Sequence, residues 1–180
     1  MSWRTDLRDA AVAALQPLCL AGGALADFMI ETSRPNDLKQ EQLPALLVYA
    51  AMQHGEPDAE RGAPLVYWKS STTIHVVARV AATDRASVET MLDAAVDAAK
   101  VALLSSPAFT GGGTEGLTRF EIVLKYDGRG EQILGEATMA FDAETHEAFP
   151  QAIPDLFVTM ANTVEPAGVA TPIQQTITLA

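Results

Sequence analysis

Two long amphipathic patterns indicate helices. Apolar residues recur every three or four positions from Trp3 to Leu18 and again over residues 84–105, with charged residues on the opposite side. This spacing predicts two helices, each with one face packed against the protein and the other in water. Pro17 should end or bend the first helix, and Thr83 is the expected N-terminal cap of the second.

The clearest strand is predicted for residues 65–82. Its even-numbered positions from Thr72 to Val80 are apolar or small and should share one face. The odd-numbered positions, which include His75 and Arg79, should share the other face because side chains alternate along a strand. At this length the strand can extend beyond its sheet as part of a hairpin.

Shorter apolar runs predict the remaining strands, at residues 27–32, 43–49, 117–126, 132–142, 156–164 and 173–179. Residues 52–64 are polar and should form an exposed loop, while Asp127 to Gly130 is typical of a hairpin turn. The order of elements predicts an α+β fold, also describable as mixed α/β. Its central mixed β-sheet carries two main helices, with a β-hairpin or extended arm in addition.

The length of 180 residues suits one domain. We expect residues 1–164 to form it and residues 165–180 to form an extended C-terminal arm, either separate from the domain or part of it. The strand expected at 173–179 can supply an edge for a neighbouring chain.

Charge and hydropathy exclude several classes of protein. The net charge of −11 is the wrong sign for binding phosphates over a large surface, although an acidic wall would let DNA slide past. The longest uncharged run, Ala10 to Ala26, is broken by Pro17 and two glycines, so we expect no membrane span. The charged first ten residues do not resemble a secretory signal, which favours residence inside a cell.

The sequence has no motif typical of an enzyme. His54, His75 and His146 are far apart and form no HExxH or HxH pattern, and the carboxylate-rich stretches 54–58 and 144–147 are typical of solvated loops. The single Cys19 excludes an intramolecular disulfide and is interpreted as a small buried residue. We therefore expect no catalytic residues, no cofactor and no metal.

Four residues are candidates for a subunit interface. Tyr67, Trp68 and Lys69 place two large aromatic side chains beside a cation at the start of the long strand, and Arg79 interrupts its apolar part. Aromatic residues and long cationic stems supply much of the affinity of desolvated interfaces. The alternatives are core packing and sheet termination for the aromatic pair, and a solvent-facing position for Arg79.

The succession of elements resembles that of bacteriophage tail terminator proteins, with the minor tail protein U family the nearest in kind. The resemblance covers Trp3 to Val164 and consists of the following features: the N-terminal helix, the LPALLVY run at 43–49, an acidic loop, the long strand through Thr72–Val80, the helix from Asp84 and the hairpin between Phe120 and Phe141. It includes no catalytic signature.

The resemblance implies a structural virion protein at the head-proximal end of a tail, made in the host cytoplasm. Such a protein caps the tail tube as a homohexameric ring, stops tube polymerisation and offers a surface for the head connector. Its partners would be its own copies, the tube protein and the connector protein, with DNA passing through the lumen without specific binding and no contact with a membrane.

Two other interpretations stay open. Another head-tail joining or tail-completion ring protein would share the size, acidity and mixed sheet. A small soluble ligand-binding domain or enzyme would instead have a pocket near Gly111 and the strand that carries His75.

Overall fold

One long strand organises the molecule. β3 (Leu65–Ala82) pairs antiparallel along its whole length with β5 (Gln132–Pro150), and on its other side with β2 (Ala45–Pro57). The computed structural model describes residues 3–32, 38–58, 65–111, 116–129, 132–150, 159–164 and 173–178. All statements below concern these residues.

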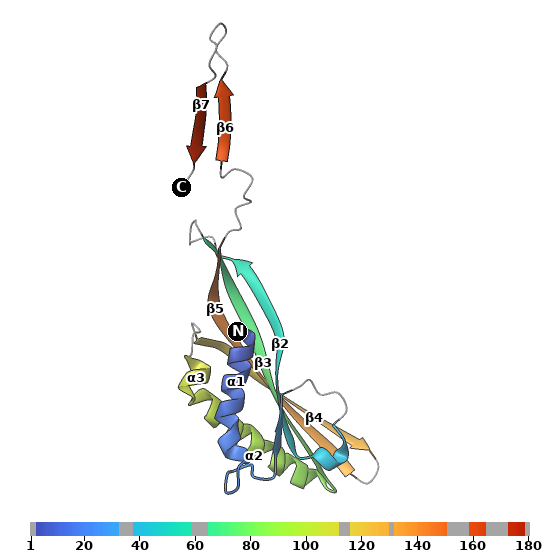
Figure 1. Ribbon diagram of the computed structural model, residues 1–180. Coiled ribbons are helices and arrows are strands. Elements are labelled where there is room, and N and C mark those ends of the chain that lie inside the picture. Colours follow the sequence, from blue (N-terminus) through green and yellow to red (C-terminus); the bar gives the residue numbers. More distant parts are fainter. Residues whose placement is uncertain are drawn as a thin grey trace.

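Two shorter additions complete the five-stranded sheet, whose order is β1-β2-β3-β5-β4. β1 (Met29–Glu31) pairs parallel with the start of β2, and β4 (Gly116–Arg129) pairs antiparallel with β5. A second sheet consists of β6 (Thr159–Val164) and β7 (Ile173–Thr178), antiparallel to each other. The predicted mixed sheet and α+β class are confirmed (Figure 1).

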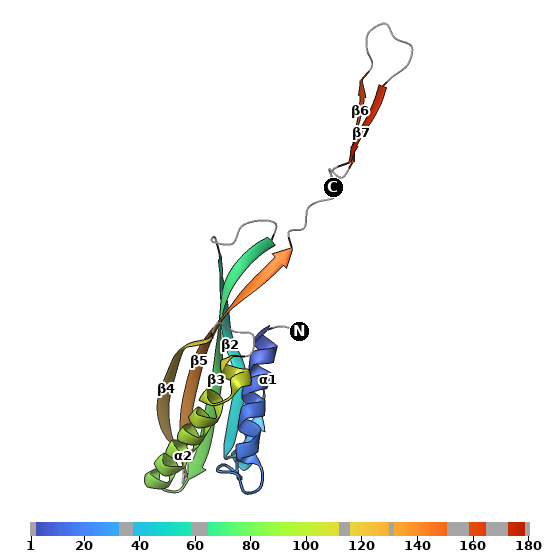
Figure 2. The ribbon, with the colours of Figure 1, turned by 90° about the vertical axis from the view of Figure 1, so that its left-hand side faces the viewer.

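The helices gather on one face of the large sheet. α1 (Trp3–Leu15) packs on β2, and α2 (Arg85–Leu104) packs on β3 and β5 (Figure 2). Short helical turns follow or connect these elements: η1 (Gln16–Cys19), η2 (Gln40–Gln42) and α3 (Pro107–Thr110). No helix of the described part of the chain is long and apolar enough to cross a membrane.

The core lies between these two helices and the sheet. Its largest fully buried side chains are Phe109, Phe141, Leu15, Leu46, Ile74, Leu92, Leu103 and Met139. The even-numbered face of β3 belongs to this core, as its alternation predicted. The apolar stripe of α2 faces the core as well, which confirms the amphipathic interpretation of that helix.

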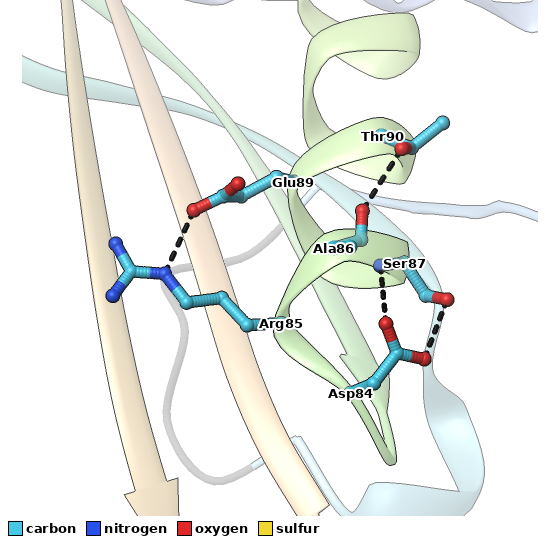
Figure 3. A network of polar contacts seen from close by, with 6 residues as sticks. All are labelled: Asp84, Arg85, Ala86, Ser87, Glu89 and Thr90. Atoms are coloured by element: carbon cyan, nitrogen blue, oxygen red, sulfur yellow. Dashed lines mark hydrogen bonds and ion pairs between the residues drawn. The ribbon is translucent and has the colours of Figure 1, made fainter.

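The cap of α2 differs from the prediction by one residue. Asp84, rather than Thr83, has the extended N-cap conformation, and its carboxylate accepts hydrogen bonds from the Ser87 N–H at 2.8 Å and the Ser87 hydroxyl at 2.7 Å (Figure 3). These two bonds lower the pKa of Asp84. The charge beside the first helical N–H groups also suits the helix dipole.

Three strands run further than their local sequence indicates. β2 continues through His54 to Pro57, where the sequence predicted a loop, and β5 continues from Asp142 to Pro150. The reason is that β3 offers hydrogen-bonding partners along all of its length, so polar segments beside it become strands. Similarly, β4 continues through the expected turn to Arg129, which pairs with Gln132.

Gly135 tests the contact between α2 and the sheet. A Cβ atom at this position would lie 2.4 Å from Val88 Cγ1 and 2.8 Å from Leu92 Cδ1, both in fully buried side chains. Gly135→Ala should therefore lower the free energy of unfolding by about 1–3 kcal/mol, measured by urea denaturation. Gly128→Ala is the control because a Cβ there meets nothing within 4 Å. Equal effects of the two substitutions would contradict the close approach.

Alanine substitution should show that Asp84, and not Thr83, caps the N-terminus of α2. Asp84→Ala should lower the urea midpoint, whereas Thr83→Ala should leave it nearly unchanged. Since the folded protein lowers the pKa of Asp84, its stabilising contribution is present above the unfolded pKa and is lost as the pH falls through the folded one. The difference between Asp84→Ala and the wild type should consequently shrink in acid. A larger effect of Thr83→Ala would favour the original prediction.

Candidate interaction surface

The outer strand β4 presents an open edge with apolar side chains. β4 pairs with β5 on one side and, among the described strands, with none on the other. On the face that carries the helices, four residues of β4 follow one another at alternate positions: Phe120, Ile122, Leu124 and Tyr126. We call these four residues the β4 strip.

The β4 strip is only partly covered because α2 lies over β3 and β5. Phe120 is 51% exposed, Leu124 43% and Tyr126 37%. Contacts at the inner side of the strip hold two of the rings: Phe120 stacks on Phe141 with 6.3 Å between ring centroids, and the Arg85 guanidinium lies 5.1 Å from the centroid of Tyr126. An exposed edge of this length with apolar side chains is a surface on which another strand can pair.

The opposite margin of the sheet is open as well. β1 covers Ala45, Leu46 and Leu47 of β2, and no described strand lies outside the remainder of β2. Met52, in that uncovered part, is 63% exposed. The chain therefore has two open sheet edges with different sequences, at opposite sides of the same sheet.

Three strands continue past β4 and beyond the helices (Figure 2). We call this part the tip; it consists of residues 53–57 of β2, 66–71 of β3 and 145–149 of β5. Polar contacts join its strands: Ser70 donates to Glu147 Oε2 at 2.6 Å, Gln53 Nε2 lies 3.5 Å from the same oxygen, and His146 Nδ1 lies 3.0 Å from Asp58 Oδ2. The tip is thus a three-stranded extension whose strands are joined by polar contacts and which also carries the half-exposed Phe149.

The structure divides the four predicted interface residues between two places. Tyr67, Trp68 and Lys69 lie on the tip, where the two aromatic side chains are partly buried and Lys69 Nζ lies 3.0 Å from Glu144 Oε2. Arg79 lies ten residues further along β3, about 33 Å away. There its guanidinium contacts the Glu136 carboxylate at 2.7–2.8 Å. An interface role for any of the four stays a prediction.

The histidines and carboxylates do not gather into a metal site within the described residues. His54 and Glu147, which the sequence assigned to loops, lie in β2 and β5. His75 lies apart from both, with its Nδ1 3.3 Å from the Tyr49 hydroxyl on the face of the sheet away from the helices. Burial lowers the pKa of His75, and the charge of Asp142 partly opposes this by raising it.

In the sequence, the four residues of the β4 strip alternate with more polar ones over positions 120–126. Such alternation is typical of a strand with one buried face, whereas Phe120, Leu124 and Tyr126 are exposed in the structure. The exposure arises from the position of α2 over β3 and β5. No signal within residues 117–126 reports which strands a distant helix covers.

Comparisons with known proteins give distant structural likenesses. No protein-family model and no curated protein matches the chain. A chain from the virion of a native gene transfer agent particle is 13% identical with a TM-score of 0.39, over 79% of this chain and 99% of that one. A chain from the sheath/tube terminator of an extracellular contractile injection system, PVC, in its extended state is 14% identical with a TM-score of 0.40, over 95% of this chain and 66% of that one. Likenesses at this level settle neither a partner nor an activity.

The environment of His75 predicts a pH dependence of stability. Because burial lowers the pKa of His75 below its usual value of about 6.5, the unfolded chain takes up a proton before the folded protein does. The contribution of this residue to stability is therefore present above pH 6.5 and is lost as the pH falls. The urea midpoint of the wild type should fall more between pH 7.5 and 5.5 than that of His75→Gln. The exposed His54→Gln is the control, and an unchanged slope in His75→Gln would contradict the prediction.

Proposed function

We propose that this chain is a structural protein of a phage-type tail that closes the tail tube as a ring. In this role it stops polymerisation of the tube and gives the head connector a surface to bind. The observation that carries the proposal is the pair of open edges: the β4 strip at one side of the sheet and the uncovered part of β2 at the other. Two unlike surfaces on opposite sides of a subunit are what a head-to-tail ring requires.

The order of elements supports the same role. The elements follow one another as in the tail terminator resemblance: the N-terminal helix, strand β2 that begins within the LPALLVY run, the long β3, α2 and the β4–β5 hairpin. The two distantly similar chains come from a virion and from an injection system, which agrees with the proposal without carrying it. The tip, with Tyr67 to Lys69, would contact the tube or the connector.

The net charge of −11 suits a ring through which DNA passes. Like charges on the wall would keep the phosphates from binding as the DNA slides through the lumen. We propose six copies in the ring, and residues 1–164 as the part that builds it. The other ring proteins of head-tail joining are the second candidate, because the same open edges would serve them equally well.

Mass and shape in solution provide the first test. Light scattering after size-exclusion chromatography, over a concentration series, should give a species of about 115 kDa, six times 19.1 kDa. Negative-stain images of that species should show a central hole. When added to growing tubes of the particle's tube protein, the ring should shorten them and occupy one end.

Two results would contradict the proposal. The first is a chain that stays monomeric at all concentrations and leaves tube growth unchanged. The second is a monomer whose melting temperature rises with a small molecule and whose His75→Ala variant loses that response, because this result would favour a ligand-binding domain.

A further inference from the structure

One face of the tip is apolar. Val66 and Trp68 lie at even-numbered positions of β3, on the same face of the strand as the buried Ile74. Residues directly opposite each other in antiparallel strands share a face, which places Phe149 of β5 beside Val66 and Pro57 of β2 beside Trp68. We call Pro57, Val66, Trp68 and Phe149 the tip patch.

The helices leave the tip patch uncovered, because they end short of the tip (Figure 2). Phe149 is 50% exposed and Pro57 is exposed, while Val66 and Trp68 are half-buried. The Trp68 ring packs on the backbone of Gly55, where an added Cβ atom would lie 3.5 Å from its Cε3. Aromatic side chains that are held in place and open to solvent are typical of surfaces on which a partner binds.

The opposite face of the tip pairs its own charges. Lys69 Nζ lies 3.0 Å from Glu144 Oε2, and His146 Nδ1 lies 3.0 Å from Asp58 Oδ2. A partner that bound there would first have to displace these contacts, which leaves little net gain. The tip patch is therefore the face of the tip that is better suited to binding.

One carboxylate borders the tip patch. Glu147 is the direct partner of Trp68 and shares its face. Glu147 Oε2 accepts a hydrogen bond from Ser70 Oγ at 2.6 Å and lies 3.5 Å from Gln53 Nε2. Both contacts use the same oxygen, and no residue of the described chain donates a hydrogen bond to Oε1. The carboxylate is thus held in place with one oxygen able to bind a cation beside the apolar surface.

Charge selects the kind of partner. Among the described residues in and beside the tip, Glu56, Glu144 and Glu147 outnumber Lys69, and the whole chain has a net charge of −11. The tip of a second copy would bring like charge, whereas a surface with an arginine or lysine beside apolar side chains would be attracted. An arginine at this place can bind Glu147 Oε1 and stack on the ring of Trp68.

We infer that the tip patch docks on a basic and apolar surface of the tube protein, with its aromatic side chains on apolar residues there and Glu147 on an arginine or lysine. The identity of the partner rests on the proposed function, because a ring that stops polymerisation must occupy the surface that the next tube subunit would bind. The contact assigns the tip to the tube rather than to the connector. It also places Tyr67 and Lys69 on the face away from the tube.

Site-specific photo-crosslinking tests this contact. Full-length chains carry the photo-reactive p-benzoylphenylalanine in place of Phe149, and tubes of the particle's tube protein are the probe. After mixing and irradiation, we expect the main product to join this chain to the tube protein, in a segment where mass spectrometry finds an arginine or lysine beside apolar residues. The same group at Ala148 is the matched control, because that position is exposed but lies on the opposite face of β5. It should give at least tenfold less of the product.

Replacement of Phe149 measures the apolar part of the contact. Phe149→Ala should weaken binding to tube ends at least tenfold in co-sedimentation. Leu20→Ala, which removes an exposed leucine outside the tip, should leave binding unchanged. Thermal unfolding of each variant verifies that the chain still folds.

Replacement of Glu147 measures the charged part. Glu147→Gln keeps an acceptor for the Ser70 hydroxyl and removes the charge, so it should weaken binding to tube ends and make that binding less sensitive to salt. Glu144→Gln is the matched control, because it changes the net charge equally and lies on the other face of β5. Its binding and salt sensitivity should stay near those of the wild type.

The outcomes separate this contact from the proposed ring. Rings that form and shorten tubes without a tube adduct at position 149 would overturn tip docking and leave the ring standing. Adducts mainly with the connector, with a second copy or within the same chain would also overturn it, as would unchanged binding in both Phe149→Ala and Glu147→Gln. A tube adduct at position 149 without a closed ring would support the docking and contradict the ring.

Discussion

The full-length pairing of β3 with β5 is the constraint on which the rest of the structure depends. Eighteen residues of β3 have direct partners in β5, so the two strands form a continuous ribbon that is longer than any other element of the sheet. α2 packs across the half of this ribbon that contains Gly135. The other half extends past β4 and becomes the tip. The division of the molecule into a covered body and a projecting tip follows from a ribbon longer than the helices that cover it.

The same arrangement creates the interaction surface. A helix covers a limited width of sheet, and α2 is centred on β3 and β5. The apolar side chains of β4 therefore contact the core only on their inner side, where Phe120 stacks on Phe141. Their outer side is exposed to water. Exposed apolar area and an unpaired strand edge are costly in a monomer, since they promote association without selectivity. A protein whose function is to join others can use both, provided that a defined partner covers them.

Two polar arrangements limit where such partners bind. On the face of the sheet away from the helices, Arg79 with Glu136 and Thr73 with Asp142 satisfy one another within the chain. Residues already paired in this way gain little from a new contact, because binding must first replace the existing one.

Local sequence determined the elements of this protein, and long-range pairing determined their extent and exposure. Amphipathic periodicity identified both main helices, and alternation identified β3 to the residue, because these signals arise within a few turns or pleats of chain. The cap at Asp84, one residue from the predicted Thr83, depends on the precise start of α2.

The strand character of residues 52–57 and 143–150 was not predictable locally, since polar segments become strands only where a long neighbour supplies hydrogen bonds. Likewise, the alternation that places Phe120 and Leu124 on one face of β4 is the same whether that face is buried or exposed. Which of the two they become was decided by where α2 settles on the sheet.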